Sequence, residues 1–187
     1  MSDTSPSRPE HYSASAKWLH WLTALCIFAI IPMGIAMHEM KDSALKNQLY
    51  DLHRSLGFVV LVLVVLRIAV KLAKGSPGPY VGLTKFERIA SVATHHLLYL
   101  LLIAMPIVGW AMTNAFSAGL QLKVFGLFTL PHLIGEDKAL FGILQKMHKA
   151  GGIAMAVLVI LHVAGALMHT FVKRDTVLWR MLPRKWD

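Results

Sequence analysis

Apolar residues gather into four long blocks along the chain, and shorter polar or glycine-rich stretches separate these blocks. A helix needs roughly 20 mainly apolar residues to cross the hydrocarbon layer of a membrane, and each block reaches that length. In lipid a helix satisfies the hydrogen bonds of its own backbone, so even the β-branched run 59–65 is expected to be helical. The spans predicted from this pattern are about residues 17–37, 52–72, 89–112 and 147–172.

The pattern therefore predicts an all-α integral membrane protein, with one membrane domain over residues 1–187 and four helices packed as a bundle. Apolar residues make up 56% of the chain and its mean hydropathy is +0.55, which is high for a soluble domain. Pro32 and Pro106 are expected to kink their helices near the far ends. No cleavable signal peptide is expected, because the first apolar run is too long for one.

The connection 114–146 carries too many apolar side chains for an ordinary surface loop. It is expected to lie on the outer membrane interface, and a re-entrant packing role is favoured at least as much as a role as a lid over a substrate. The stretch 75–82, in contrast, is rich in glycine and proline and predicts a turn-rich linker. The apolar residues of the long connection are Leu120, Leu122, Val124, Phe125, Leu127 and Phe128.

The formal net charge is +9, but the basic residues flank the apolar blocks and form no stripe, so a nucleic-acid partner is not expected. The N-terminal segment, the connection 67–88 and the C-terminal tail together carry twelve Lys and Arg residues, against seven in 38–54 and 114–149. By the positive-inside rule both termini are expected in the cytoplasm. The twelve are Arg8, Lys17, Arg67, Lys71, Lys74, Lys85, Arg88, Lys173, Arg174, Arg180, Arg184 and Lys185.

Several kinds of chemistry are excluded by the residues that the chain lacks. Cys26 is the only cysteine, so one chain can form no disulfide framework, cysteine zinc site or iron–sulfur cluster. Acidic residues are absent from the interiors of the spans, which argues against a transporter that uses buried carboxylates. No catalytic serine–histidine–acid set and no phosphate-binding loop is evident.

Four histidines lie inside the predicted spans or just at their ends, where an ionisable side chain is costly and usually functional. His148 and His162 are fourteen residues apart, which is 40° short of four full helical turns. Both therefore point to one face of their helix, about 21 Å apart along its axis. His53 lies at the depth of His148, and His20 lies nearer the depth of His162.

These depths predict two pairs: His53 with His148 at the outer side and His20 with His162 at the inner side. Two histidines are a common set of axial ligands for a b-type haem, so two haems b are expected, stacked across the bilayer as an electron path. His95 lies at a depth that also suits His162. On depth alone it competes with His20 as the inner ligand.

Small residues follow the histidines at helical spacing and share a face with them. They would let a flat macrocycle approach the backbone, although small residues also serve simply to pack membrane helices together. The glycines concerned are Gly57, Gly151, Gly152 and Gly165.

Basic residues beside the histidines are candidates for contacts with haem propionates. Arg54 and Lys149 adjoin the outer ligands, and Arg67 follows His53 by fourteen residues on nearly the same face. The alternative for Arg67 is an anchor that reaches the membrane interface. His169, seven residues after His162, could bond a quinone carbonyl or cap the end of its helix.

Five strings in their order resemble the bacterial cytochrome b561 family. They are LHW in the first span, LHRSLG in the second, HHLLYLLLIAMPIVGW in the third, MHKAGG with ILH fourteen residues on in the fourth, and RMLPRKW in the tail. Each string is weak alone, but their order and spacing are specific. The likeness extends from about His11 to Trp186.

The resemblance implies a four-helix protein of the bacterial inner membrane, with two b haems held by His20, His53, His148 and His162. It thus favours His20 over His95 as the inner ligand. It also implies electron exchange with ubiquinone near His95 and His169 on the cytoplasmic side. Oxidation of superoxide at the outer face, coupled to quinone reduction, is described within the family.

The resemblance thus favours an enzyme of the superoxide:ubiquinone oxidoreductase type. Arg54, Lys146 and Lys149 lie near the outer pair in the sequence, and a positive mouth would attract the superoxide anion. Two histidine ligands leave iron no open position, so the electron would pass outer-sphere. The alternatives are a cytochrome subunit that serves a separate dehydrogenase or hydrogenase, and a membrane protein without haem.

Overall fold

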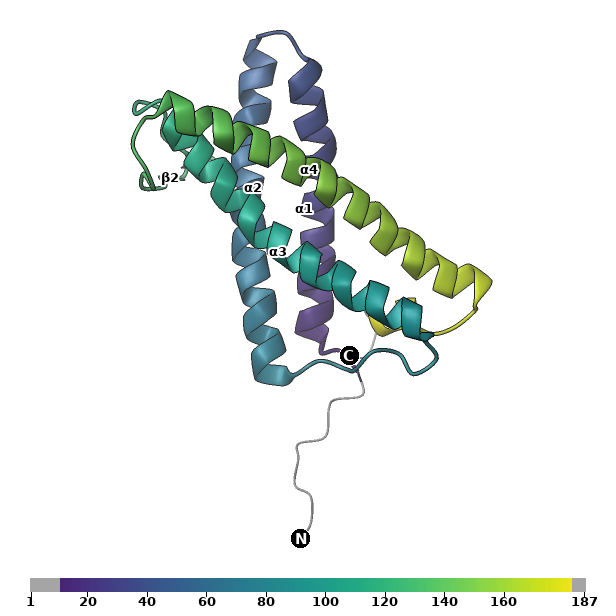
Figure 1. The fold of residues 1–187 in the computed structure, drawn as a ribbon. Coiled ribbons are helices and arrows are strands. Elements are labelled where there is room, and N and C mark those ends of the chain that lie inside the picture. Colours follow the sequence, from purple (N-terminus) through teal and green to yellow (C-terminus); the bar gives the residue numbers. More distant parts are fainter. Residues whose placement is uncertain (1–10, 183–187) are drawn as a thin grey trace.

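The computed structural model describes residues 11–182, and four long helices dominate it (Figure 1). The all-α membrane bundle expected from the sequence is confirmed. Arg8, Arg184, Lys185 and Trp186, which entered the charge count or the resemblance, lie outside the described residues. The helices are α1 (Ala14–Glu39), α2 (Ala44–Lys74), α3 (Lys85–Phe116) and α4 (Lys138–Leu167).

Shorter elements complete the described part of the chain. An antiparallel pair of two-residue strands, β1 (Lys123–Val124) and β2 (Phe128–Thr129), lies between α3 and α4. The π-helical turn η1 (Met168–Val172) continues α4 without a break, and the 3₁₀ turn η2 (Leu178–Arg180) follows.

Each of the four helices is long and apolar enough to cross a membrane. The first three predicted spans lie inside α1, α2 and α3, and the fourth, 147–172, begins inside α4 and ends with η1. The helices extend beyond the predicted spans because polar residues cap their ends. The largest difference is in α4, which begins at Lys138 instead of near residue 147. The Asp137 side chain accepts hydrogen bonds from the amides of Ala139 and Leu140 at 2.9 and 3.0 Å, and such N-caps are strongly favourable.

Alternate helices run in opposite directions, so the bundle has two distinct ends. We call the end where α1 and α3 begin and α2 and α4 finish the terminal end, and the opposite one the hairpin end. The pair α1 and α2 stands upright in Figure 1, and the pair α3 and α4 crosses it obliquely. Helix α2 packs against α1 and α3, and α3 packs against α4.

The core between the helices is small, because most side chains of the spans face outward. It draws residues from all four helices, and few other residues of the spans are buried inside the protein. This is the distribution expected when lipid covers the outer surface, since apolar side chains there lose nothing by exposure to acyl chains. The buried core residues are Ile27, Val60, Val64, Leu102 and Met155.

The long apolar connection is shorter than predicted, because α3 continues to Phe116 and α4 begins at Lys138. Three of its residues, Leu122, Val124 and Leu130, are buried and pack against Phe58 and Trp110. These contacts give the connection a packing role on the hairpin end of the bundle.

The tip of the β1–β2 turn stays at the surface, where Leu127 is 80% exposed. Phe125 and Gly126 there both have positive φ angles, of 50° and 73°. The buried Ser55 hydroxyl of α2 accepts a hydrogen bond from the Phe125 amide at 2.9 Å, which holds the turn against the bundle.

Candidate histidine sites

At the hairpin end, His53 of α2 and His148 of α4 face each other. Their ring centres are 6.1 Å apart and the ring planes lie at 69°. The Nδ1 atom of each ring is buried and has no hydrogen-bond partner among residues 11–182. Buried polar atoms without partners are rare in folded proteins, and each one requires an explanation. We call these two residues the hairpin-end pair.

Each ring of the hairpin-end pair packs against a glycine of a neighbouring helix. A Cβ at Gly34 of α1 would lie 3.5 Å from His53 Cε1, and one at Gly109 of α3 would lie 3.1 Å from His148 Cε1.

The sequence analysis missed Gly34 and Gly109, because it looked for small residues only on the helices that carry the pairs. Both follow a proline inside a span, Pro32 and Pro106. That shared order of proline and glycine is the signal that could have identified them.

At the terminal end, His20 of α1 and His162 of α4 have ring centres 6.0 Å apart, with the planes at 65°. We call these two residues the terminal-end pair. His95 of α3 lies on the other side of His162, with a ring-centre separation of 5.2 Å. The structure thus brings together both residues that depth alone left in competition.

Arg67 of α2 reaches into the terminal-end pair from the side. Its Nη2 donates to His20 Nδ1 at 3.3 Å, and its guanidinium lies 5.2 Å from the centre of the Tyr99 ring. A cationic side chain in this position is therefore directed toward the histidines and not toward the membrane interface.

The two neighbouring histidines of α3 point in different directions. His95 Nδ1 donates to the Ser91 carbonyl oxygen at 2.6 Å, and His96 Nδ1 donates to the Val92 carbonyl oxygen at 2.7 Å. Of these two α3 histidines, His95 is the one that contacts the ring of His162.

The ring separations test whether a single iron fits between two histidines. Metal–imidazole bonds are about 2 Å long, and a ring nitrogen lies about 1 Å from its ring centre, so two imidazoles across one metal have centres roughly 6 Å apart. The 6.1 Å of His53 and His148 and the 6.0 Å of His20 and His162 match this spacing. The 5.2 Å between His95 and His162 is shorter.

The glycines beside the histidines test whether a flat group has room there. A Cβ at Gly57, Gly152 or Gly165 would meet no described atom within 4 Å, so open space adjoins three of the four candidate ligands. Gly151 is different, because a Cβ there would collide with the Met105 side chain. Gly151 thus allows close packing of α3 against α4, which is the alternative role that the sequence offered for these small residues.

A bare metal ion fits less well than a haem. Within residues 11–182 there is no group of three or more histidine, cysteine or acidic side chains placed to hold one. A haem iron needs only two axial ligands from the protein, because the macrocycle supplies the other four. The paired imidazoles, the unpartnered Nδ1 atoms and the open space beside the glycines all fit that requirement.

The cations of the hairpin end are close to the histidine pair but already have partners. Arg54 makes an ion pair with Asp51 at 3.2 Å. The Lys149 ammonium donates to His38 Nε2 at 3.4 Å. Lys146, also exposed, lies one turn before Lys149 on α4.

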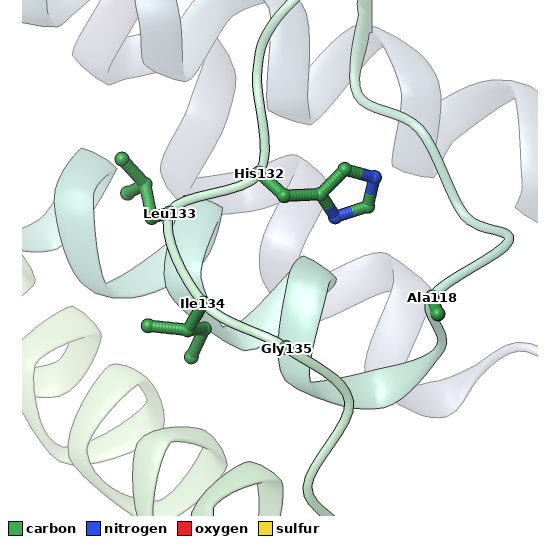
Figure 2. Close-up of a pocket in the computed structure, with 5 residues that line it drawn as sticks. All are labelled: Ala118, His132, Leu133, Ile134 and Gly135. Atoms are coloured by element: carbon green, nitrogen blue, oxygen red, sulfur yellow. The ribbon is translucent and has the colours of Figure 1, made fainter.

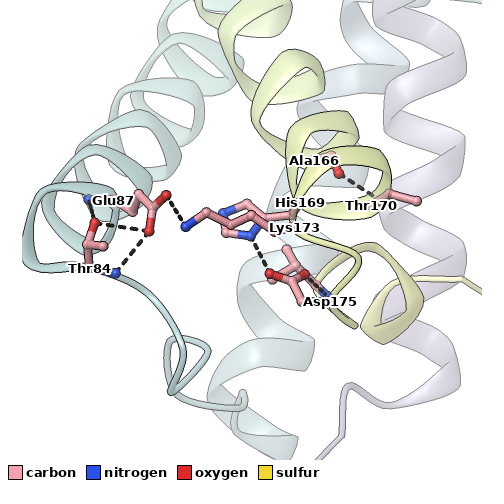
Figure 3. A network of polar contacts seen from close by, with 8 residues as sticks. Thr84, Glu87, Ala166, His169, Thr170, Lys173 and Asp175 are labelled. Carbon is pink, nitrogen blue, oxygen red and sulfur yellow. Dashed lines mark hydrogen bonds and ion pairs between the residues drawn. The ribbon is translucent and has the colours of Figure 1, made fainter.

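His169 is buried in η1, and its Nδ1 donates to Asp175 Oδ2 at 2.6 Å (Figure 3). Its ring thus contacts a carboxylate, and the alternative of a simple helix cap is not what the side chain does. The sequence analysis missed Asp175, because a turn of unpredicted shape brings it back to a residue six positions earlier.

A shallow surface pocket lies on the long connection, lined by Ala118 and the stretch 132–135 (Figure 2). None of the predicted haem or quinone residues lines it. His132, which is exposed there, stays without an assigned role.

Comparison with known proteins places this arrangement in context. A family model described as prokaryotic cytochrome b561 matches residues 11–184. The chain is 29% identical to cytochrome b561 homolog 2 of Escherichia coli K12, over 93% of this chain and 92% of that protein. It is 30% identical to the probable superoxide oxidase CybB of Yersinia pestis, over 93% of this chain and 97% of that protein. Identity to a cytochrome b562 of Cereibacter sphaeroides is 27%, over 88% and 90% of the two chains.

Proposed function

The chain belongs to the prokaryotic cytochrome b561 family, and from this premise we propose that it moves electrons across the bacterial inner membrane through two b haems. Electron transfer with b-type haem is the property of the family. The number of haems, the donor, the acceptor and the orientation are the parts that we propose for this chain.

One observation carries the proposal: α4 presents two histidines on one face, and each meets an imidazole of another helix at about the spacing of a shared iron. His53 and His148 would hold the first haem, and His20 and His162 the second. The haems supply an iron that gains and loses one electron reversibly. The helices fix the separation of the two sites and exclude water from the space between them.

The charge count supports an orientation with the hairpin end in the periplasm and both termini in the cytoplasm. Three of the twelve basic residues assigned to the cytoplasmic side lie outside the described residues. Counted over the described residues alone, nine Lys and Arg residues lie on that side and seven on the other, so the predicted orientation is the same.

We propose superoxide as the electron donor at the hairpin end. A relative 30% identical to this chain is named a probable superoxide oxidase, and Arg54, Lys146 and Lys149 supply positive charge at that end. Because His53 and His148 would together hold the haem, superoxide would pass on its electron without bonding to iron and would leave as dioxygen. Arg54 and Lys149 could also contact propionates.

We propose ubiquinone as the acceptor at the terminal end, beside His95 and His169. Both residues belong to the same end of the bundle as His162, and each has a Nδ1 partner that leaves the other ring nitrogen, Nε2, available. When the ring is protonated, Nε2 can donate a hydrogen bond to a quinone carbonyl oxygen. Arg67 is placed to bind a propionate of the terminal-end haem.

The test uses the purified protein with its full complement of haem. We expect two low-spin b haems per chain, reduction of both by enzymatically generated superoxide, and one quinol formed for two superoxide ions. Superoxide dismutase, added as a control, should stop quinol formation. Haems that stay oxidised under superoxide, yet are reduced by a co-purified dehydrogenase or hydrogenase, would assign the chain to the role of an electron-transfer subunit.

A further inference from the structure

The chain reverses direction directly after α4, and this reversal places an acid beside a buried histidine. The helix widens in η1 to a π-helical turn, a local form that often occurs at functional sites. Arg174 then takes a left-handed conformation with a φ of 53°, which residues with a Cβ rarely adopt. The Asp175 amide donates to the His169 carbonyl oxygen at 3.1 Å and so closes the turn.

The carboxylate of Asp175 is fixed through both of its oxygen atoms. Oδ2 accepts from His169 Nδ1 at 2.6 Å, and Oδ1 accepts from the Val177 amide at 3.0 Å. The side chains of His169 and Asp175 are 8% and 14% exposed, and Figure 3 shows that they face each other. A carboxylate held in this way has one defined orientation toward the imidazole.

The other charged side chains near His169 and Asp175 are paired with each other, so Asp175 is the charged partner of the His169 imidazole. Lys173 on the same segment makes an ion pair with Glu87 of α3, and the Thr84 amide also donates to Glu87, at 2.9 Å. Lys173 thus forms its ion pair with Glu87 and not with Asp175, although its charge still contributes to lowering the pKa of Asp175. Figure 3 draws both interactions: His169 with Asp175, and Lys173 with Glu87.

Asp175 carries its negative charge at neutral pH. Burial alone acts to raise the pKa of this carboxyl group, but the hydrogen bonds from His169 and Val177 and the nearby cations outweigh it and lower the pKa below its ordinary value. An ionised carboxylate only accepts hydrogen bonds. The proton between the two side chains therefore belongs to His169 Nδ1, which leaves Nε2 as the atom that can bind and release a second proton.

Quinone reduction needs protons that superoxide does not bring. Two superoxide ions lose one electron each and leave as two dioxygen molecules, while the quinone gains two electrons and two protons to become quinol. Those protons come from water outside the membrane. His169 lies seven residues beyond His162, about two helical turns nearer to the end of the bundle, between that water and the terminal-end pair.

Building on the proposed reduction of quinone at the terminal end, we propose that His169 and Asp175 form the proton-delivery site of this reaction. His169 Nε2 donates a proton to a quinone oxygen and takes its replacement from water at the terminal end, once for each electron. Asp175 is a positioning residue: it fixes the ring by the bond to Nδ1 and stabilises the protonated imidazolium between transfers.

Asp175→Asn separates these roles, because the amide oxygen can still accept from Nδ1 but carries no charge. The assay uses haem-replete protein, reduced with dithionite without oxygen and mixed with ubiquinone-1, and follows reoxidation of the haems between about pH 5.5 and 9. Asp42→Asn is the matched control, since Asp42 is a fully exposed acid paired with Lys46 at the hairpin end.

We expect Asp175→Asn to keep its haem content, its spectra and its half-saturating quinone concentration. Its maximal rate at neutral pH should fall about 10- to 100-fold, less than the full contribution of a positioned proton donor, because the imidazole itself is kept. Because the imidazolium is less stabilised without the carboxylate, the decline of the rate with rising pH should begin at a lower pH. His169→Gln should be slow at every pH.

Two results would overturn the inference. One is an Asp175→Asn variant with the rate and pH profile of the wild type; the other is a variant that loses haem and slows equally at every pH, which indicates a structural role alone. If the reduced wild-type protein is not reoxidised by ubiquinone at any pH, the proposed function itself fails, and that outcome is distinct because it appears without any substitution.

Discussion

The two ends of the bundle carry similar histidine pairs in different surroundings. At the hairpin end the Nδ1 atoms of His53 and His148 are buried and lack hydrogen-bond partners among residues 11–182. At the terminal end His20, His95 and His169 each have a partner for Nδ1, which is a guanidinium, a backbone carbonyl or a carboxylate. The spacing of the pairs is nearly the same, so the difference lies in what surrounds them.

This difference matches two kinds of chemistry. The donor reaction that we propose, oxidation of superoxide, moves no proton, so histidines whose Nδ1 atoms lack hydrogen-bond partners in the described part of the chain, with cations nearby, would suffice at the hairpin end. The acceptor reaction that we propose, reduction of a quinone, consumes two protons and would need groups at the terminal end that bind and release them. The structure provides such groups at the end where η1 and the tail return to the bundle, and this contrast leads to four predictions.

The largest effect is expected from removing a ligand of the hairpin-end pair. His148→Ala should reduce the haem content from two per chain to one and abolish quinone reduction driven by superoxide, because the terminal-end haem then lacks its donor. Haem extraction and quantification against protein, with spectra of the reduced form, measure this directly. His132→Ala, which changes an exposed histidine of the long connection, is the matched control. Two haems in His148→Ala would contradict the pairing.

The next prediction separates the two candidates at the terminal end. His20→Ala should lose one haem, because the His20–His162 separation fits a shared iron, whereas His95→Ala should keep both haems and reduce quinone more slowly. Both residues have a partner at Nδ1: Arg67 for His20, and the Ser91 carbonyl oxygen for His95. In His95 this leaves Nε2 free to bind iron, so loss of a haem from His95→Ala and not from His20→Ala would make His95 the ligand.

A smaller effect is expected from the cations of the hairpin end. The double variant Arg54→Gln, Lys149→Gln should lower the second-order rate of haem reduction by superoxide roughly threefold to tenfold at low salt, because steering of an anion depends on nearby charge. Pulse radiolysis at increasing ionic strength measures it. The difference from the wild type should shrink as salt screens the charges, and a difference that is independent of salt would point to altered propionate contacts instead.

The smallest effect concerns the glycines that support the hairpin-end rings. Gly109→Ala places a methyl group at 3.1 Å from His148 Cε1, closer than ordinary contact, whereas Gly34→Ala places one at 3.5 Å from His53. We expect Gly109→Ala to destabilise haem binding by about 1 kcal/mol, a typical cost of overpacking, and Gly34→Ala to have little effect. Thermal release of haem compares the two, and equal effects would show that the His148 ring can shift freely.

Much of the fold follows from the sequence because lipid permits few solutions. Twenty apolar residues in a row predict a helix almost regardless of propensity, so the four spans were identified even through valine runs. The ends of the helices were missed because they depend on single capping contacts, such as those of Asp137. The resemblance to the cytochrome b561 family was confirmed by the family model.

The predicted pairs also follow from periodicity, since fourteen residues bring His148 and His162 to one face, and the structure places a partner beside each. Their role as ligands stays a prediction. What periodicity cannot supply is a contact between helices or across a turn. Gly34 and Gly109 support rings on other helices, and Asp175 meets His169 only through the π-helical turn and the left-handed Arg174.

One consequence concerns how the protein is made. Both histidine pairs draw one member from α4, which is the last of the four helices to leave the ribosome. Neither pair can exist while only the first three helices are in the membrane, so a chain that stops early presents single histidines and no complete cradle. On the proposed ligand assignment, neither haem would have both of its histidines until α4 is inserted, so an unfinished chain would not hold a haem between two histidines.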